Sequence, residues 1–193
     1  MKLQVNPTRG SGKDKLRSAL LLGLSLYLTA CAVPIVTFFD DSGGGRDLAK
    51  GESATVHFFT NDPNLDTGVR LNAGTRYAVD VVILSNWIDS YIEENETGEA
   101  LDETGFANSV MPFEWLGFTR RSRQNRWFEL MLYQPDCGRE SLRGVTELDV
   151  DETNGSYQFI ASCDGKLSMF VNDSPGFYGN NAGYANINLS RVN

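Results

Sequence analysis

The chain has 193 residues, and its 17 Lys and Arg face 25 Asp and Glu, which gives a formal net charge of −8. An acidic surface repels a phosphate backbone, so nucleic acid is excluded as the expected partner. The length is enough for one domain with a sizeable hydrophobic core.

Residues 1–30 have the pattern of a bacterial export signal. A basic start is followed by an apolar core that is too short for a stable span, and by small residues before a cysteine. These parts are, in order, Lys13, Lys15 and Arg17, then Leu20–Leu28, then Leu28-Thr29-Ala30-Cys31. The ending resembles a bacterial lipobox, which implies that Cys31 is lipidated and becomes the mature N-terminus. An uncleaved anchor and a plain signal peptide are the alternatives.

Lipidation predicts the compartment. Two or more acyl chains anchor a protein durably, so we expect a membrane-attached protein of the bacterial cell envelope. The residue after the cysteine is Ala32 rather than Asp. In the enteric-type sorting rule for lipoproteins, a residue other than Asp at this position favours the outer membrane. Loss of residues 1–30 removes five Lys and Arg and one Asp, which leaves a mature charge of −12.

Residues 31–52 are predicted to be a lipidated cysteine and a flexible tether. The segment begins with apolar Ile35–Phe39, which fits either an edge strand or a segment near the lipid, and it continues into Gly43-Gly44-Gly45. A glycine run is flexible. The folded domain is therefore expected to cover residues 53–193.

From residue 53 the pattern is all-β, because short runs of alternating apolar residues are separated by Gly, Pro and Asn turns. The strongest hairpin signal is Asn154-Gly155. The predicted strands are 54–60, 76–85, 126–133, 145–150, 156–162, 166–172 and 184–190. We predict a β-sandwich or jelly roll of the galactose-binding-domain type.

Two cysteines remain after Cys31 is used by the lipid. Cys137 and Cys163 are predicted to form a disulfide, because the periplasm is oxidising. In the chain-entropy model, such a bond stabilises the folded state by about 3 kcal/mol, because it closes a loop in the unfolded chain. Two separate thiols are the alternative.

An acidic segment and a basic cluster follow each other along the chain. Residues 89–103 hold seven acidic side chains and fit either a solvated loop or a second cation-binding or partner-binding loop. Arg120, Arg121, Arg123 and Arg126 form the basic cluster. The cluster either pairs with the acidic segment at the surface, where each pair contributes little, or binds carboxylates or a phosphorylated sugar.

Residues 172–183 concentrate hard oxygen donors between two predicted strands. Calcium takes about 6–8 oxygen ligands, and Asp173, Asn180 and Asn181 offer side-chain oxygens while Phe177 offers a carbonyl. Gly176 and the glycines after it allow a tight turn. The alternative is an Asx-rich turn that only shapes the loop.

The run Asp173-x-Pro-Gly-x-Tyr-Gly-Asn-Asn181 resembles the calcium loop of the PA-IL-like galactophilic lectins. The resemblance implies Asp173, Asn180 and Asn181 as side-chain ligands and Phe177 as a carbonyl ligand. It also implies a further carbonyl from an earlier segment, where Ser90 or Tyr91 lies nearest.

The resemblance covers residues 53–193, and Asn72-Ala73-Gly74 with the strand Tyr77–Leu84 resembles the earlier segment. One feature departs from it. The family contacts galactose through a His and a Gln of a middle loop, but the one histidine here, His57, lies in the first predicted strand. Calcium binding is therefore separable from galactose specificity.

The tryptophans Trp87, Trp115 and Trp127 are candidates for stacking on a sugar, although each also fits a core position. Trp87 lies nearest the expected ligand, and Trp127 is expected to be buried. The sequence has no Gly-x-Ser-x-Gly, His-Glu-x-x-His or P-loop motif, so no enzyme activity is expected.

We therefore expect a lipid-anchored, lectin-like protein that binds carbohydrate, galactose-like sugars included, through a loop-bound Ca²⁺. The expected sugar contacts are Asp173, Asn180, Tyr91 and Trp87. The alternative is a protein-binding lipoprotein on the same fold, either an accessory subunit of an envelope complex or a toxin-immunity protein.

Overall fold

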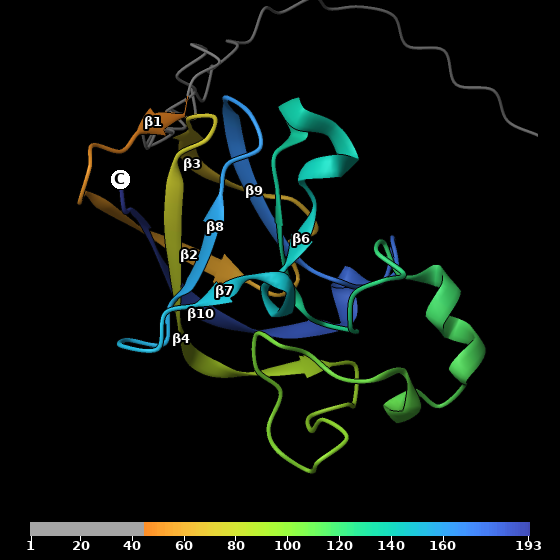
Figure 1. Cartoon of the computed structure of the whole chain (residues 1–193). Coiled ribbons are helices and arrows are strands. Elements are labelled where there is room, and N and C mark those ends of the chain that lie inside the picture. Colours follow the sequence, from red (N-terminus) through yellow and green to blue (C-terminus); the bar gives the residue numbers. More distant parts are fainter. Residues whose placement is uncertain (1–44) are drawn as a thin grey trace, which may run out of the picture. The chain divides into compact units, whose positions relative to one another are not determined.

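The computed structural model describes residues 45–193, which form two five-stranded sheets (Figure 1). The first sheet holds, in spatial order, β1 (Arg46–Asp47), β3 (Leu65–Leu71), β9 (Gly165–Val171), β5 (Leu130–Tyr133) and β6 (Arg143–Gly144). The second holds β2 (Ser53–Phe59), β10 (Asn181–Arg191), β4 (Arg76–Asp89), β8 (Tyr157–Ile160) and β7 (Asp149–Val150). The short 3₁₀ turns are η1 (Asn108–Val110), η2 (Glu114–Thr119), η3 (Pro135–Ser141), η4 (Val145–Glu147) and η5 (Tyr178–Asn180). The predicted all-β sandwich is confirmed.

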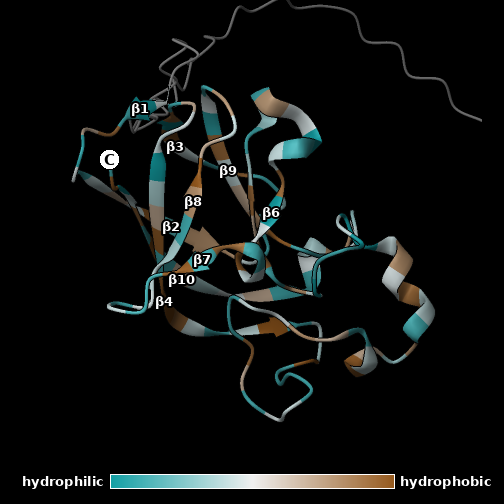
Figure 2. Cartoon of the chain, viewed as in Figure 1, coloured by the Kyte–Doolittle hydropathy of each residue, from teal (hydrophilic) through white to brown (hydrophobic). Residues whose placement is uncertain are grey.

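Strand β10 lies between β2 and β4 and pairs antiparallel with both. Its alternate residues Ala185, Ile187 and Leu189 are fully buried, because successive strand side chains point to opposite faces. Figure 2 shows the same alternation of hydrophobic and hydrophilic residues along the strands. The pairing sets Asn181 opposite Asp89, so the start of β10 meets the end of β4.

Some predicted strands differ from the observed ones where the backbone leaves the extended region. The predicted strand 126–133 begins only at Leu130, because Phe128 has a φ of 60°. The predicted strand 145–150 is mostly the η4 turn, and only Asp149 and Val150 form a strand. Strand β3 was not predicted, because Asp66 and Gly68 disfavour a strand by propensity.

The folded domain begins earlier than residue 53. Strand β1 pairs in parallel with β3, and Leu48 is a core residue. The backbone amide of Gly51 donates a 2.8 Å hydrogen bond to the carbonyl of Arg191. Residues 45–52 are therefore part of the sandwich rather than of a tether. The predicted signal, the lipidated Cys31 and the rest of the tether lie outside the described residues. Within residues 45–193, no helix is long and apolar enough to cross a membrane.

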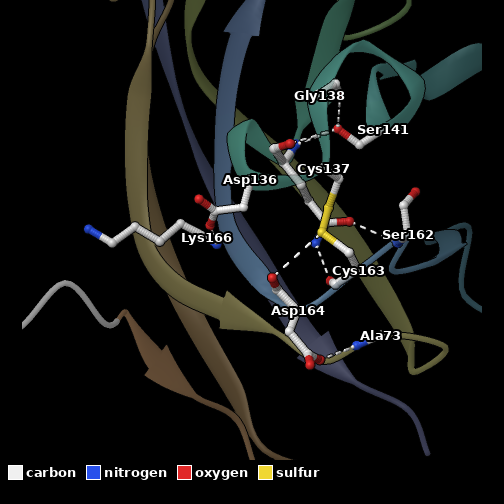
Figure 3. Close-up of a disulfide and its surroundings, with 10 residues drawn as sticks. Ala73, Asp136, Cys137, Gly138, Ser141, Ser162, Cys163, Asp164 and Lys166 are labelled. Atoms are coloured by element: carbon white, nitrogen blue, oxygen red, sulfur yellow. Dashed lines mark hydrogen bonds between the residues drawn. A yellow bond between two sulfur atoms is a disulfide. The ribbon is translucent and has the colours of Figure 1, made fainter.

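Cys137 and Cys163 form the predicted disulfide (Figure 3), with their Cα atoms 5.8 Å apart. The bond joins η3 to the segment between β8 and β9. The buried amide of Gln134 strengthens the same junction, because it donates to the carbonyl of Cys163 at 2.8 Å and accepts the backbone amide of Ser162 at 2.9 Å. The bond therefore ties the connection between β5 and β6 to the segment that leads from β8 of the second sheet into β9 of the first.

Replacing both cysteines with serine is expected to lower the free energy of unfolding by about 3 kcal/mol, since the unfolded chain regains a loop. The two positions are 26 residues apart. Urea unfolding followed by tryptophan fluorescence measures the loss. Reduction of the wild type should have the same effect and should leave the double variant unchanged. Equal stability of all samples would contradict the expectation.

Candidate functional site

A cluster of buried polar side chains lies at the C-terminal ends of β4 and β9 and at the start of β10. Asp173, which follows β9, is 2% exposed, while Asn181 and Asp89 are each 6% exposed. The amide nitrogen of Asn181 donates to Oδ2 of Asp173 at 3.0 Å and to the carbonyl of Thr60 at 3.3 Å. The structure thus brings together Asp173 and Asn181, two of the four loop residues predicted from the sequence.

The amide oxygen of Asn181 is buried and has no hydrogen-bond partner within the described part of the chain. The two acceptors around its amide nitrogen fix the orientation of the group, so the oxygen points away from both. An unsatisfied buried acceptor costs about 1–3 kcal/mol. A cation at this oxygen would remove that cost.

Asp89 is the residue of this cluster that sequence reasoning missed. No hydrogen bond among residues 45–193 ends on its carboxylate, and burial together with the nearby Asp173 charge raises its pKa from 3.8 to about 7. The signal was present in the alternation of β4, where Trp87 and Asp89 share the buried face. An acidic residue on an inward face either binds a proton or needs a compensating charge.

Asp173 has a raised pKa as well, mainly because it is buried. Hydrogen bonds from Asn181 and from the backbone amide of Ser174, the latter at 2.6 Å, oppose this shift. Two buried carboxylates therefore lie close together, and each repels the other when both are charged.

Ser90 joins the end of β4 to the loop. Its backbone amide donates to the carbonyl of Asn180 at 3.2 Å, and its φ is 58°. A left-handed conformation is uncommon in a non-glycine residue, and such strain often occurs at binding sites. The predicted neighbours Ser90 and Asn180 are thus in contact through their backbones.

The remaining predicted residues lie at the outer side of the loop. Phe177 and Asn180 are exposed, and the carbonyl of Phe177 accepts the backbone amide of Asn180 at 3.1 Å. No hydrogen bond among the described residues involves the side chain of Asn180. Tyr91 is also exposed and lines a surface hollow of about 400 Å³. These groups face solvent, where a ligand can reach them.

The expectation that Trp87 stacks on a sugar is wrong. Trp87 is 1% exposed, and its ring packs against Phe58 at 5.6 Å and Phe128 at 6.2 Å between centroids. No ring face is left for a ligand. Trp127 is buried, as predicted, whereas Trp115 is exposed.

The other charged segments have separate roles. His57 lies on β2, 2.8 Å from the amide oxygen of Asn186, and therefore is not part of the cluster. In the acidic segment, Glu96 pairs with Arg126 at 2.6 Å. Within residues 45–193, no three or more His, Cys, Asp or Glu side chains group as metal ligands. A metal at the cluster would consequently depend on amide and carbonyl oxygens besides Asp89 and Asp173.

The donors present fit calcium. Two carboxylates, the unpartnered oxygen of Asn181 and nearby backbone carbonyls are all hard oxygen ligands, and the cluster holds neither thiol nor imidazole. A divalent cation would neutralise Asp89 and Asp173 together. Asp89 adds a second negative charge to the donor set implied by the sequence resemblance.

A solved structure described as the N-terminal domain of EclA, a PllA-like lectin, is similar to this chain with a TM-score of 0.42. The match covers 72% of this chain and 94% of that one, with 19% identical residues. No protein-family model and no curated protein matches the chain. At this identity and TM-score, the assignment of ligands depends on the residues of this chain.

Proposed function

We propose that the protein binds carbohydrate through a calcium ion held at the cluster of Asp89, Asp173 and Asn181. The observation that carries the proposal is the buried amide oxygen of Asn181, which has no partner among residues 45–193, in a cluster that also holds two buried carboxylates. An Asx-rich turn that only shaped a loop would satisfy its own polar groups. These three side chains instead leave one buried acceptor without a partner, and among residues 45–193 no basic side chain forms an ion pair with either carboxylate.

Each residue has a defined task in this proposal. Asp89 and Asp173 supply negative charge, and Asn181 supplies a neutral oxygen that its two hydrogen bonds hold in place. Asn180 and the carbonyls of Phe177 and Ser90 complete the oxygen set from the outer side. A calcium ion held by these residues would supply open coordination positions for two neighbouring hydroxyl groups of a sugar.

The outer surface would determine which sugar binds. Tyr91, which follows Ser90, and Phe177 are both exposed and offer apolar contacts to a ring. Because His57 lies away from the cluster, the histidine contact expected for galactose is missing. We therefore propose a calcium-dependent sugar site whose specificity differs from that of the galactophilic family. Anchoring at the outer membrane by a lipid on Cys31 is part of the same proposal.

Calorimetry with calcium, followed by a glycan array in calcium and in chelator, tests the function. We expect one calcium ion per chain and glycan binding that disappears in chelator. Failure of the wild type to bind calcium would refute the proposal. Calcium binding without any glycan ligand would refute its carbohydrate part.

A pull-down from envelope extracts, with and without chelator, distinguishes carbohydrate binding from the alternative of a protein-binding lipoprotein. A partner that is retained without calcium and by an Asp173→Asn variant would favour the alternative. A partner lost under both conditions would be bound through the calcium loop.

A further inference from the structure

Five arginines line one surface hollow of about 940 Å³ beside the loop that follows β9. Arg120, Arg121 and Arg123 follow η2, Arg139 belongs to η3, and Arg143 begins β6. Glu140 is the one acidic residue that lines the hollow. The net charge of the chain is −8, so the local charge of the hollow has the opposite sign to that of the whole chain.

None of these five arginines has an ion-pair partner within residues 45–193. The three ion pairs there join Arg46 to Glu52, Arg126 to Glu96 and Lys166 to Asp66. The predicted pairing of the basic cluster with the acidic segment therefore holds for Arg126 alone. Glu140 in the lining and the nearby charge of Glu129 offset part of this positive charge, but neither forms an ion pair with the five arginines.

The hydrogen bonds of the five guanidinium groups go to neutral acceptors. Arg123 donates to the carbonyl of Phe118 at 3.1 Å, and Arg143 donates to the carbonyl of Leu142 at 2.8 Å. The side chain of Arg139 makes no hydrogen bond with residues 45–193. Each of these side chains therefore keeps N–H groups free for a ligand, because a guanidinium has five.

Arg120 is partly buried. Its guanidinium lies over the ring of Trp127, 5.3 Å from the centroid, and burial lowers its pKa, although the charge of Glu129 opposes this shift. A partly buried cation gains more from a bound anion than an exposed one does, because water screens it less.

The walls of the hollow are held in place by Asn172, which is fully buried. Its side-chain nitrogen donates to the carbonyls of Ser122 at 2.9 Å and Arg126 at 2.8 Å, and its oxygen accepts the backbone amide of Ser122 at 2.9 Å. The backbone amide of Arg121 donates to the carbonyl of Asp173 at 3.1 Å. The arginine segment is thus fixed before any ligand binds, which reduces the entropy lost on binding.

An exposed row of aromatic side chains continues from the hollow. Phe113, Trp115 and Phe118 are 59%, 61% and 57% exposed. The rings of Phe113 and Trp115 lie 6.2 Å apart, and those of Trp115 and Phe118 lie 6.0 Å apart. Phe118 also lines the hollow, so the row and the arginines form one surface. Figure 1 shows this segment, in green, projecting beside the strands.

We propose that this hollow and its aromatic row form a second, calcium-independent site that binds an anionic saccharide. Guanidinium groups bind carboxylate, sulfate or phosphate through paired hydrogen bonds, and aromatic faces pack on the C–H face of a sugar ring. The volume is within the range of ligand pockets and accommodates more than a single small anion. A nucleic acid would meet the same arginines but also the acidic remainder of the surface.

The experiment measures binding of acidic saccharides in chelator by calorimetry and by quenching of tryptophan fluorescence. The probes are trigalacturonate, a heparin-derived tetrasaccharide and glucose 6-phosphate, with maltotriose as the neutral reference. We expect at least one acidic probe to bind and maltotriose not to bind. The Arg123→Gln/Arg139→Gln double variant should weaken binding by at least about 10-fold, since two charge-assisted contacts are lost.

Two further variants distinguish binding in the hollow from non-specific electrostatic attraction. Arg70→Gln makes the same change on β3, outside the hollow, and should leave the affinity unchanged. Trp115→Ala should remove most of the fluorescence quenching, and thermal melts confirm that each variant folds. The proposal would be overturned if no acidic probe binds, if Arg70→Gln weakens binding as much as the double variant, or if binding requires calcium. Equal affinity for a single-stranded oligonucleotide or for anionic vesicles would also overturn it. Failure of the calcium site leaves these outcomes unaffected.

Discussion

Asp173→Asn is expected to weaken calcium binding by about 100-fold or more, because it removes one of two negative charges from the cluster. Even residues that only support a metal ligand typically contribute about 10–100-fold to affinity, so a direct ligand should contribute at least the upper end. The asparagine keeps the size of the side chain and an acceptor for the backbone amide of Ser174. Calorimetry gives the affinity directly.

Thermal stability provides a second measurement of the same effect. A ligand that binds only the folded state stabilises it by about 2.7 kcal/mol at 100 times its Kd, so calcium should raise the melting temperature of the wild type. The rise should be absent in Asp173→Asn. Asp149→Asn, on the exposed strand β7, is the matched control and should respond like the wild type. A calcium response that persists in Asp173→Asn would exclude this residue as a ligand.

Much of the fold follows from local patterns in the sequence. Strands β2, β9 and β10 alternate apolar and polar residues, and their positions were predicted within a few residues. The disulfide followed from the number of cysteines and the expected compartment. Strand β3 was missed because Asp66 and Gly68 weaken its local pattern, and because the strand forms by pairing with β9, a partner about 100 residues away. Single-segment patterns do not contain such pairings.

The candidate site was likewise predictable only where its residues lie close together in the sequence. Asp173 and Asn181 belong to one loop, so their spacing in the sequence showed them together. Asp89 joins them only because β10 pairs with β4, which sets Asn181 opposite Asp89. The arginine hollow likewise combines two segments, residues 120–123 and 139–143, that no motif connects. Long-range strand pairing therefore determines the part of each site that the sequence did not reveal.

Asp89→Asn is expected to stabilise the metal-free protein while it weakens calcium binding. The pKa of Asp89 is raised to about 7 in the folded state from an ordinary value of 3.8, which applies to the unfolded chain. The folded protein therefore binds the proton more tightly, and stability falls as the pH rises through this window. Above about pH 7 the full cost is present, on the order of 2–4 kcal/mol. The neutral asparagine avoids this cost.

Urea unfolding in chelator, at about pH 8 and about pH 4, measures this effect. The variant should exceed the wild type at the higher pH and come close to it at the lower one, where Asp89 is protonated in the folded state and partly protonated in the unfolded chain. Asp80→Asn, at an exposed position of the same strand, should change stability at neither pH. Opposite effects on stability and on calcium affinity would mean that the charge of Asp89 serves binding rather than folding. If the variant is instead less stable than the wild type at the higher pH, a structural role for the carboxylate replaces the ligand role.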